Sequence, residues 1–145
     1  TLATREVKIG HFCAMPTHFH FEGVELKKGG LSRMMQRFGN AYTKYINTRH
    51  NRSGHLFEGP FQATHILDND QLLNISTYIH NNPRGLKNYL DREHMYPWSS
   101  FQDYVAANRW GGLLVTQPIL EQFNDPQEYK TFVNQSDTKL ELEDT

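Results

Sequence analysis

The chain has 145 residues, with 15 Lys and Arg against 16 Asp and Glu, eight His and a single Cys. This length suits one domain, or one domain with a small appendage, and the 12% of aromatic residues predicts that most of the chain folds. No stretch approaches the ~20 apolar residues of a membrane span, no apolar signal region opens the chain, and one Cys excludes an internal disulfide framework, so we expect a cytoplasmic protein with no membrane partner.

Charge is distributed unevenly along the chain. Residues 27–65 hold seven Lys and Arg and one acid, whereas residues 118–145 hold seven acids and two Lys. A basic segment with interleaved aromatic residues is typical of a surface that binds a polyanion, although a solvated helix face followed by a loop gives the same pattern. The acidic end is typical of a solubilising or partly frayed tail. The basic residues are Lys27, Lys28, Arg33, Arg37, Lys44, Arg49 and Arg52.

Two short strands are predicted first. Residues 7–14 alternate between apolar and polar side chains with one slip, and residues 17–24 alternate cleanly. In the second strand, His18, His20 and Glu22 fall on one face and two phenylalanines fall on the other. The β-propensity of Phe and Thr supports this assignment.

The middle of the chain predicts a long helix and a third strand. Apolar residues recur every three or four positions over 31–48, which indicates an amphipathic helix. The polar segment 49–58 with its Ser-Gly pair indicates a loop. Weak alternation over 61–67 predicts a further strand.

A second helix is predicted over residues 70–82. Asp68 or Asn69 can cap its beginning, and apolar residues line one side of it. Pro83 is incompatible with the interior of a helix, so the helix should end at Asn82.

The remaining elements are shorter. We expect helices over 101–107, with Ser99 or Ser100 as the cap, over 117–123, and from the Asp125-Pro126 pair to residue 133. The order β-β-α-β-α predicts an α+β fold, with an antiparallel sheet, helices packed on one of its faces and small helices at the C-terminal end.

His18 and His20 are the first candidate site residues. Residues i and i+2 of a strand point the same way, so both imidazoles project from one face. Two neutral imidazoles side by side are a natural start to a divalent metal site. A pair of ordinary surface histidines gives the same pattern.

Tyr78 and Asn82 are the second candidate pair. Their spacing of four residues places both on one side of the predicted helix. The amide oxygen of Asn82 is a hard ligand suited to Mg²⁺ or Mn²⁺, and the phenol of Tyr78 can act as a nucleophile. A half-buried aromatic residue and a helix-end residue would look the same. His80 lies on a different face of the helix, which favours a structural role.

Five blocks of sequence occur in a characteristic order. They are MPTHFH from Met15, LSRMM from Leu31, SGHLFEGPF from Ser53, YIHNNPRGL from Tyr78 and YPWSS from Tyr96. Together, and in this order, these blocks resemble the single-tyrosine HUH transposases, and most closely the bacterial REP-associated tyrosine transposases. The resemblance covers residues 8 to 104, about two thirds of the chain.

The resemblance implies both a fold and a reaction. The fold would be a ferredoxin- or RRM-like antiparallel sheet. His18, His20 and Asn82 would bind Mg²⁺ or Mn²⁺, and Tyr78 would attack a phosphodiester of single-stranded, hairpin-forming DNA to leave a 5′-phosphotyrosine and a free 3′-OH. The basic residues between Lys27 and Arg52 would contact DNA. The family also implies a homodimer and a nucleoid-associated bacterial protein.

The chain departs from the family pattern at three places. Thr17 replaces an Asn, Pro60 and Gln62 stand where basic residues are common, and the strand and helix that the family carries before the strand at Val7 have no counterpart in this sequence. We expect the chain to be a fragment, a degenerate relative, or a core whose missing edge another subunit supplies. We therefore expect residues 1–90 to form a transposase-like core that lacks this edge, 91–135 a helical extension of the same domain and 136–145 an acidic tail. A non-catalytic nucleic-acid-binding relative and a metal-dependent hydrolase without a covalent step are the alternatives.

Overall fold

The computed structural model describes residues 2–137, which divide into two compact units. One unit holds residues 3–7 and 25–65, and the other holds residue 2, residues 8–24 and the chain from 66 onward. Of the acidic tail expected over 136–145, residues 138–145 lie outside the described part. No helix of the described chain is both long enough and apolar enough to cross a membrane.

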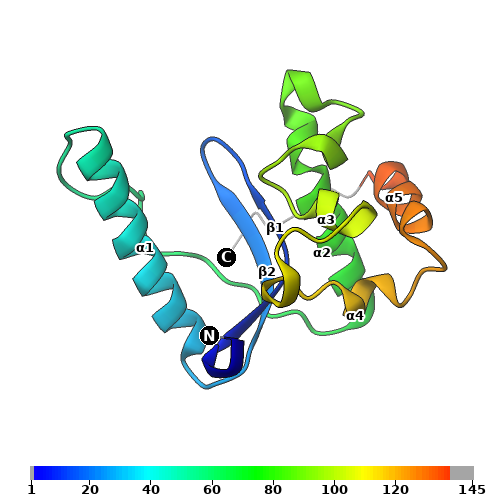
Figure 1. The fold of residues 1–145 in the computed structure, drawn as a ribbon, viewed down its shortest axis with the longest axis horizontal. Coiled ribbons are helices and arrows are strands. Elements are labelled where there is room, and N and C mark those ends of the chain that lie inside the picture. Colours follow the sequence, from blue (N-terminus) through cyan, green and yellow to red (C-terminus); the bar gives the residue numbers. More distant parts are fainter. Residues whose placement is uncertain (1, 138–145) are drawn as a thin grey trace. The chain divides into compact units, whose positions relative to one another are not determined.

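The first unit is built on helix α1, Gly30–Arg49 (Figure 1). The helix expected over 31–48 is therefore confirmed. Gly29 precedes the helix with a φ of 75°, a left-handed conformation that favours glycine. The carboxylate of Glu25 accepts hydrogen bonds from the backbone N–H groups of Gly29 (3.1 Å) and Leu31 (2.9 Å) and so satisfies donors at the start of the helix.

The expected strand over 61–67 is wrong, because this segment forms no regular structure. The side chains of residues 61–65 are all exposed, so the segment has no apolar face to bury against a sheet. Within residues 2–137 the sheet consists of two strands only. The weak alternation was not enough to indicate a strand.

The second unit contains most of the antiparallel hairpin of β1, Val7–Ala14, and β2, Phe19–Glu25. The turn closes with a hydrogen bond from the backbone N–H of Met15 to the carbonyl of His18 (2.8 Å). The far edge of β1 pairs with isolated residues from the C-terminal half, where Cys13 bridges Ser99. Both strands are confirmed, and with the helices they make the α+β fold that was expected.

Helix α2, Asn69–Asn81, confirms the second expected helix. The side chain of Asp68 accepts a hydrogen bond from the backbone N–H of Gln71 (2.8 Å), so Asp68 is the cap. The chain continues from α2 into a 3₁₀ turn, Asn82–Gly85, which contains Pro83. Ile79 of α2 packs against Cys13 of β1, which places one side of the helix on the hairpin.

Three short helices complete the second unit: α3, Phe101–Val105; α4, Gln117–Leu120; and α5, Pro126–Gln135. The first two end sooner than expected. Asp125 caps α5 as expected, through a hydrogen bond from the backbone N–H of Glu128 (2.8 Å). Helix α5 packs beside α2 and α3 (Figure 1) around a buried core of Phe101, Tyr104, Ile119, Tyr129 and Val133.

Removing the cap of α2 is expected to destabilise the second unit. Asp68→Ala leaves the N–H of Gln71 without its partner and should lower the free energy of unfolding by about 1 kcal/mol. Urea denaturation measures this change. Asp68→Ser is the control, because a hydroxyl can also cap the helix. Equal losses from the two variants would show that capping does not explain the effect.

Candidate active site

The hairpin presents the two histidines of the His-x-His pattern side by side. His18 lies in the turn just before β2 and is exposed, whereas His20 lies in β2 and is half-buried. Their ring centroids are 5.0 Å apart in an edge-to-face arrangement. The clean alternation of the sequence is thus realised as a pair of neighbouring imidazoles.

The C-terminal end of α2 meets this pair. The amide oxygen of Asn82 lies 3.1 Å from Nε2 of His18, and the ring of Tyr78 lies edge-to-face on the ring of His20 with centroids 5.3 Å apart. The amide nitrogen of Asn82 points to the carbonyl oxygen of Tyr78 at 3.5 Å, which turns the amide oxygen toward His18. All four residues therefore converge, although about 60 positions separate the two pairs.

Thr17 takes part in this arrangement, and sequence reasoning missed it. Its hydroxyl lies 3.2 Å from Nδ1 of His18. One nitrogen of His18 thus faces Thr17 and the other faces Asn82. A partner on the second ring nitrogen fixes the orientation and tautomer of a histidine ligand, so Thr17 can do for His18 what carbonyls and carboxylates do in other metal sites. Only its position next to His18 could have indicated this role.

Burial lowers the pKa of His20, and the neighbouring His18 lowers it further. Neutral imidazole is the form that binds metal ions. No cluster of three or more His, Cys, Asp or Glu side chains within residues 2–137 could hold a metal ion. A three-ligand site at this place therefore needs the amide oxygen of Asn82 together with the two histidines.

A second pair of titratable groups lies further along the hairpin. His11 of β1 is fully buried, and its Nδ1 lies 3.2 Å from a carboxylate oxygen of Glu22 in β2. Neither ring nitrogen makes a hydrogen bond in the described part of the chain, so the contact is a close approach only. A side chain at Gly10 would collide with the Glu22 carboxylate, so glycine there makes room for it. Burial lowers the pKa of His11 to about 3 and raises the pKa of Glu22 to about 7.

Acid is expected to destabilise the hairpin through His11. A depressed pKa in the folded state means that the stabilising contribution is present above the ordinary value of 6.5 and is lost as the pH falls toward 3. Burial also lowers the pKa of His80 in α2, so His80 too makes the fold less stable as the pH falls. The raised pKa of Glu22 has the opposite effect, because it makes the fold more stable as the pH falls from about 7 to 4.5.

Comparison with the variant His11→Gln isolates this contribution. The difference in unfolding free energy between wild type and variant should fall by about 1.4 kcal/mol for each pH unit below 6.5. Urea denaturation at pH 7, 6 and 5 gives this difference. A difference that is constant over this range would contradict the burial of an uncharged His11.

Comparison with known families identifies the family of this chain. The family model described as "Transposase IS200 like" matches residues 1–82, more than half of the chain. The chain belongs to the IS200-like transposase family. Searches of curated proteins and of solved structures gave no match.

Membership in the IS200-like transposase family indicates a DNA-processing transposase. All four converging residues, the two histidines with Tyr78 and Asn82, lie within the matched range. Helices α3, α4 and α5 lie beyond it. The match thus covers the hairpin, α1, α2 and Asn82, the first residue of the 3₁₀ turn that follows, and so includes every residue of the candidate site.

The seven basic residues that were predicted to contact DNA lie in the first unit of this IS200-like transposase. Lys27 and Lys28 are in the turn after β2, four lie on α1, and Arg52 is in the loop that follows; all seven are exposed. Two of them have partners within the unit. Arg33 donates to the carboxylate of Glu6 (2.9 Å), and Arg52 donates to the side-chain oxygen of Asn47 (2.7 Å). These two also support the fold of their own unit.

Proposed function

We propose that this IS200-like transposase cleaves and rejoins single-stranded, hairpin-forming DNA, with Tyr78 as the nucleophile. The observation that carries the proposal is the convergence of Tyr78 and Asn82 with His20 and His18, with a ring separation of 5.3 Å and an oxygen–nitrogen distance of 3.1 Å. A phenol beside a cluster of two imidazoles and an amide oxygen suits covalent phosphoryl transfer.

His18, His20 and Asn82 would hold Mg²⁺ or Mn²⁺. The donor set fits, because it offers two imidazole nitrogens, with the pKa of His20 lowered, and a hard amide oxygen turned toward His18. Three protein ligands would leave positions for phosphate oxygens. The bound ion would polarise the phosphate and stabilise the leaving 3′ oxygen.

The reaction is balanced without a further reagent. The oxygen of Tyr78 forms a bond to phosphorus and gives its proton to water, while the bond from phosphorus to the 3′ oxygen breaks and that oxygen takes a proton from water. The product is a 5′-phosphotyrosine and a free 3′-OH. Attack of a 3′-OH on the phosphotyrosine reverses these changes and restores the phenol, so rejoining needs no ATP.

The exposed basic residues of the first unit would bind the DNA backbone. They lie on α1 and in the turn and loop that flank it, next to exposed aromatic side chains such as Tyr42 and Tyr45. Basic side chains neutralise phosphates, and aromatic rings stack on unpaired bases. DNA affinity should therefore fall steeply as the salt concentration rises.

The proposal is tested with short DNA hairpins that carry a single-stranded flank and are labelled either at the 5′ end or at the 3′ end. Incubation of the protein with Mn²⁺ and the 3′-labelled DNA should give a labelled species that migrates slowly in a denaturing gel. The 5′-labelled DNA should give no such species, because the tyrosine is joined to the fragment on the 3′ side of the cut. Tight binding without such a species would favour a non-catalytic nucleic-acid-binding protein. Cleavage without a covalent species would favour a hydrolase, and either result would overturn the proposal.

A further inference from the structure

His80 is a fully buried histidine of α2 that bonds on both sides of its ring. Its Nδ1 lies 2.7 Å from the hydroxyl of Tyr129 in α5, and its Nε2 lies 2.8 Å from the hydroxyl of Ser100. The ring also stacks on Phe101, with centroids 5.1 Å apart and planes 8° from parallel. The ring is therefore held on opposite edges and on one face.

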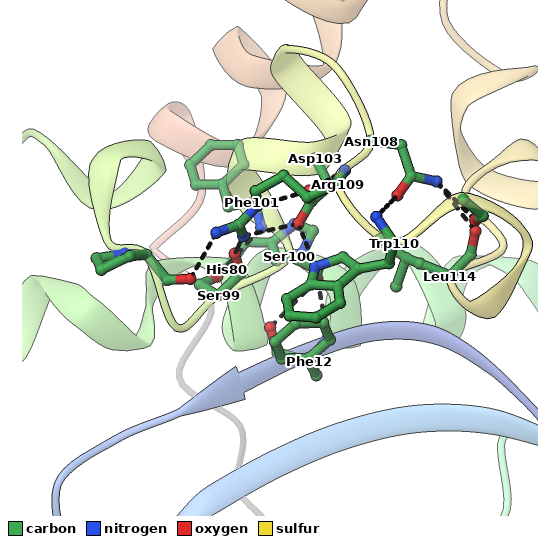
Figure 2. A network of polar contacts seen from close by, with 12 residues as sticks. Phe12, His80, Ser99, Ser100, Phe101, Asp103, Asn108, Arg109, Trp110 and Leu114 are labelled. Atoms are coloured by element: carbon green, nitrogen blue, oxygen red, sulfur yellow. Dashed lines mark hydrogen bonds and ion pairs between the residues drawn. The ribbon is translucent and has the colours of Figure 1, made fainter.

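Ser100 connects this ring to the hairpin. Its hydroxyl accepts a hydrogen bond from the backbone N–H of Phe12 in β1 (2.8 Å), and its own backbone N–H donates to the carbonyl of Phe12 (2.9 Å). Figure 2 shows His80 and Ser100 directly above Phe12, where the chain of contacts runs from α2 to β1. Because β1 pairs with β2, this connection joins the helix that carries Tyr78 to the strand that carries His20.

We infer that His80, Ser100 and Tyr129 are positioning residues, which set the rotation and height of α2 on the hairpin so that Tyr78 and Asn82 reach the two histidines. His80 is two residues from both Tyr78 and Asn82, which is about 3 Å along a helix axis. A shift of the backbone at His80 therefore also shifts both site residues. The inference rests on the proposed function and deepens it.

The size of the effect follows from the demands of phosphoryl transfer. A displacement of about 1 Å in a reacting group can reduce a rate by about 100-fold. Losing one of two bonds on the His80 ring leaves the other bond and the stack on Phe101 in place. We therefore expect a smaller displacement and a loss of about 10-fold in rate.

Two tyrosine variants make a matched test. Tyr129→Phe removes the hydroxyl that bonds His80, whereas Tyr104→Phe removes an equally buried hydroxyl that donates to the carbonyl of Gly10, also at 2.7 Å. Both variants keep the ring and lose a hydrogen bond of 2.7 Å, and Tyr129→Phe also loses a hydrogen bond with the side chain of Ser76, which lies in α2 as well. Only Tyr129→Phe removes a hydrogen bond to His80 of α2.

A rate and an affinity distinguish a positioning role of Tyr129 from a purely stabilising one. Tyr129→Phe should form the covalent species with DNA about 10-fold more slowly in a single turnover, and should bind Mn²⁺ several-fold more weakly by electron paramagnetic resonance. Tyr104→Phe should match the wild type in both. Equal effects of the two variants, or no effect of Tyr129→Phe, would overturn the inference.

The Mn²⁺ measurement keeps the two hypotheses apart. A wild-type protein that forms no covalent species would refute the proposed reaction, but the Mn²⁺ affinities of the two variants would still decide whether Tyr129 positions Asn82. A wild-type protein that binds no Mn²⁺ would overturn the positioning inference as well.

Discussion

Tyr78→Phe is expected to abolish the covalent protein–DNA species, with a loss of at least about 1,000-fold in its rate of formation. In the proposed reaction the Tyr78 hydroxyl would form the new bond to phosphorus; the substitution removes this hydroxyl and leaves the ring that contacts His20. Binding of the DNA hairpin should therefore be unchanged. A denaturing gel measures the covalent species, and fluorescence anisotropy measures binding.

Tyr89→Phe is the matched control for this result. Tyr89 packs against the same buried cluster as Tyr78 and contacts the ring of Tyr96, with centroids 5.0 Å apart. Its variant should keep the wild-type rate. Cleavage that survives Tyr78→Phe would mean that water attacks the phosphodiester, and a covalent species that survives would place the nucleophile on another residue.

Local periodicity predicted the candidate residues, but not that they would meet. The two-residue repeat of a strand places His18 beside His20, and the four-residue repeat of a helix places Tyr78 near Asn82. Neither repeat says where the helix sits on the hairpin. That expectation came from the resemblance of the five blocks to the HUH transposases, whereas Ser100 and Tyr129, which bond His80 of α2, belong to neither repeat.

Ser100 shows why the rest could not be predicted. A serine before an apolar run is typical of a helix cap, yet its hydroxyl makes no cap bond to α3 and instead contacts His80 and Phe12. The choice between a local and a distant partner depends on tertiary packing. For the same reason α3, which has five residues, gave only a weak signal, because a helix that short is stable only through its contacts.

Arg109 stabilises the turn that precedes Ser100. The guanidinium of Arg109 makes two hydrogen bonds of 2.9 Å to the two carboxylate oxygens of Asp103, and donates to the backbone carbonyls of Pro97 (2.8 Å) and Ser99 (3.0 Å), as Figure 2 shows in part. The side chain of Asp103 is fully buried. Arg109 therefore neutralises the buried carboxylate of Asp103 and fixes the backbone of the turn before α3.

Arg109→Ala should lower the free energy of unfolding by about 3–5 kcal/mol, because it leaves the buried carboxylate of Asp103 without its counter-ion. Arg33→Ala is the control. Arg33 pairs with Glu6 at the same 2.9 Å, but the pair is exposed to solvent, so its loss should cost much less stability than the loss of Arg109.

The double variant Arg109→Ala with Asp103→Leu separates charge from shape. It removes the buried charge together with its partner, so it should recover part of the stability lost in Arg109→Ala. Chemical denaturation measures all three variants. If the double variant were no more stable than the single one, the backbone bonds to Pro97 and Ser99, rather than the ion pair, would account for the role of Arg109.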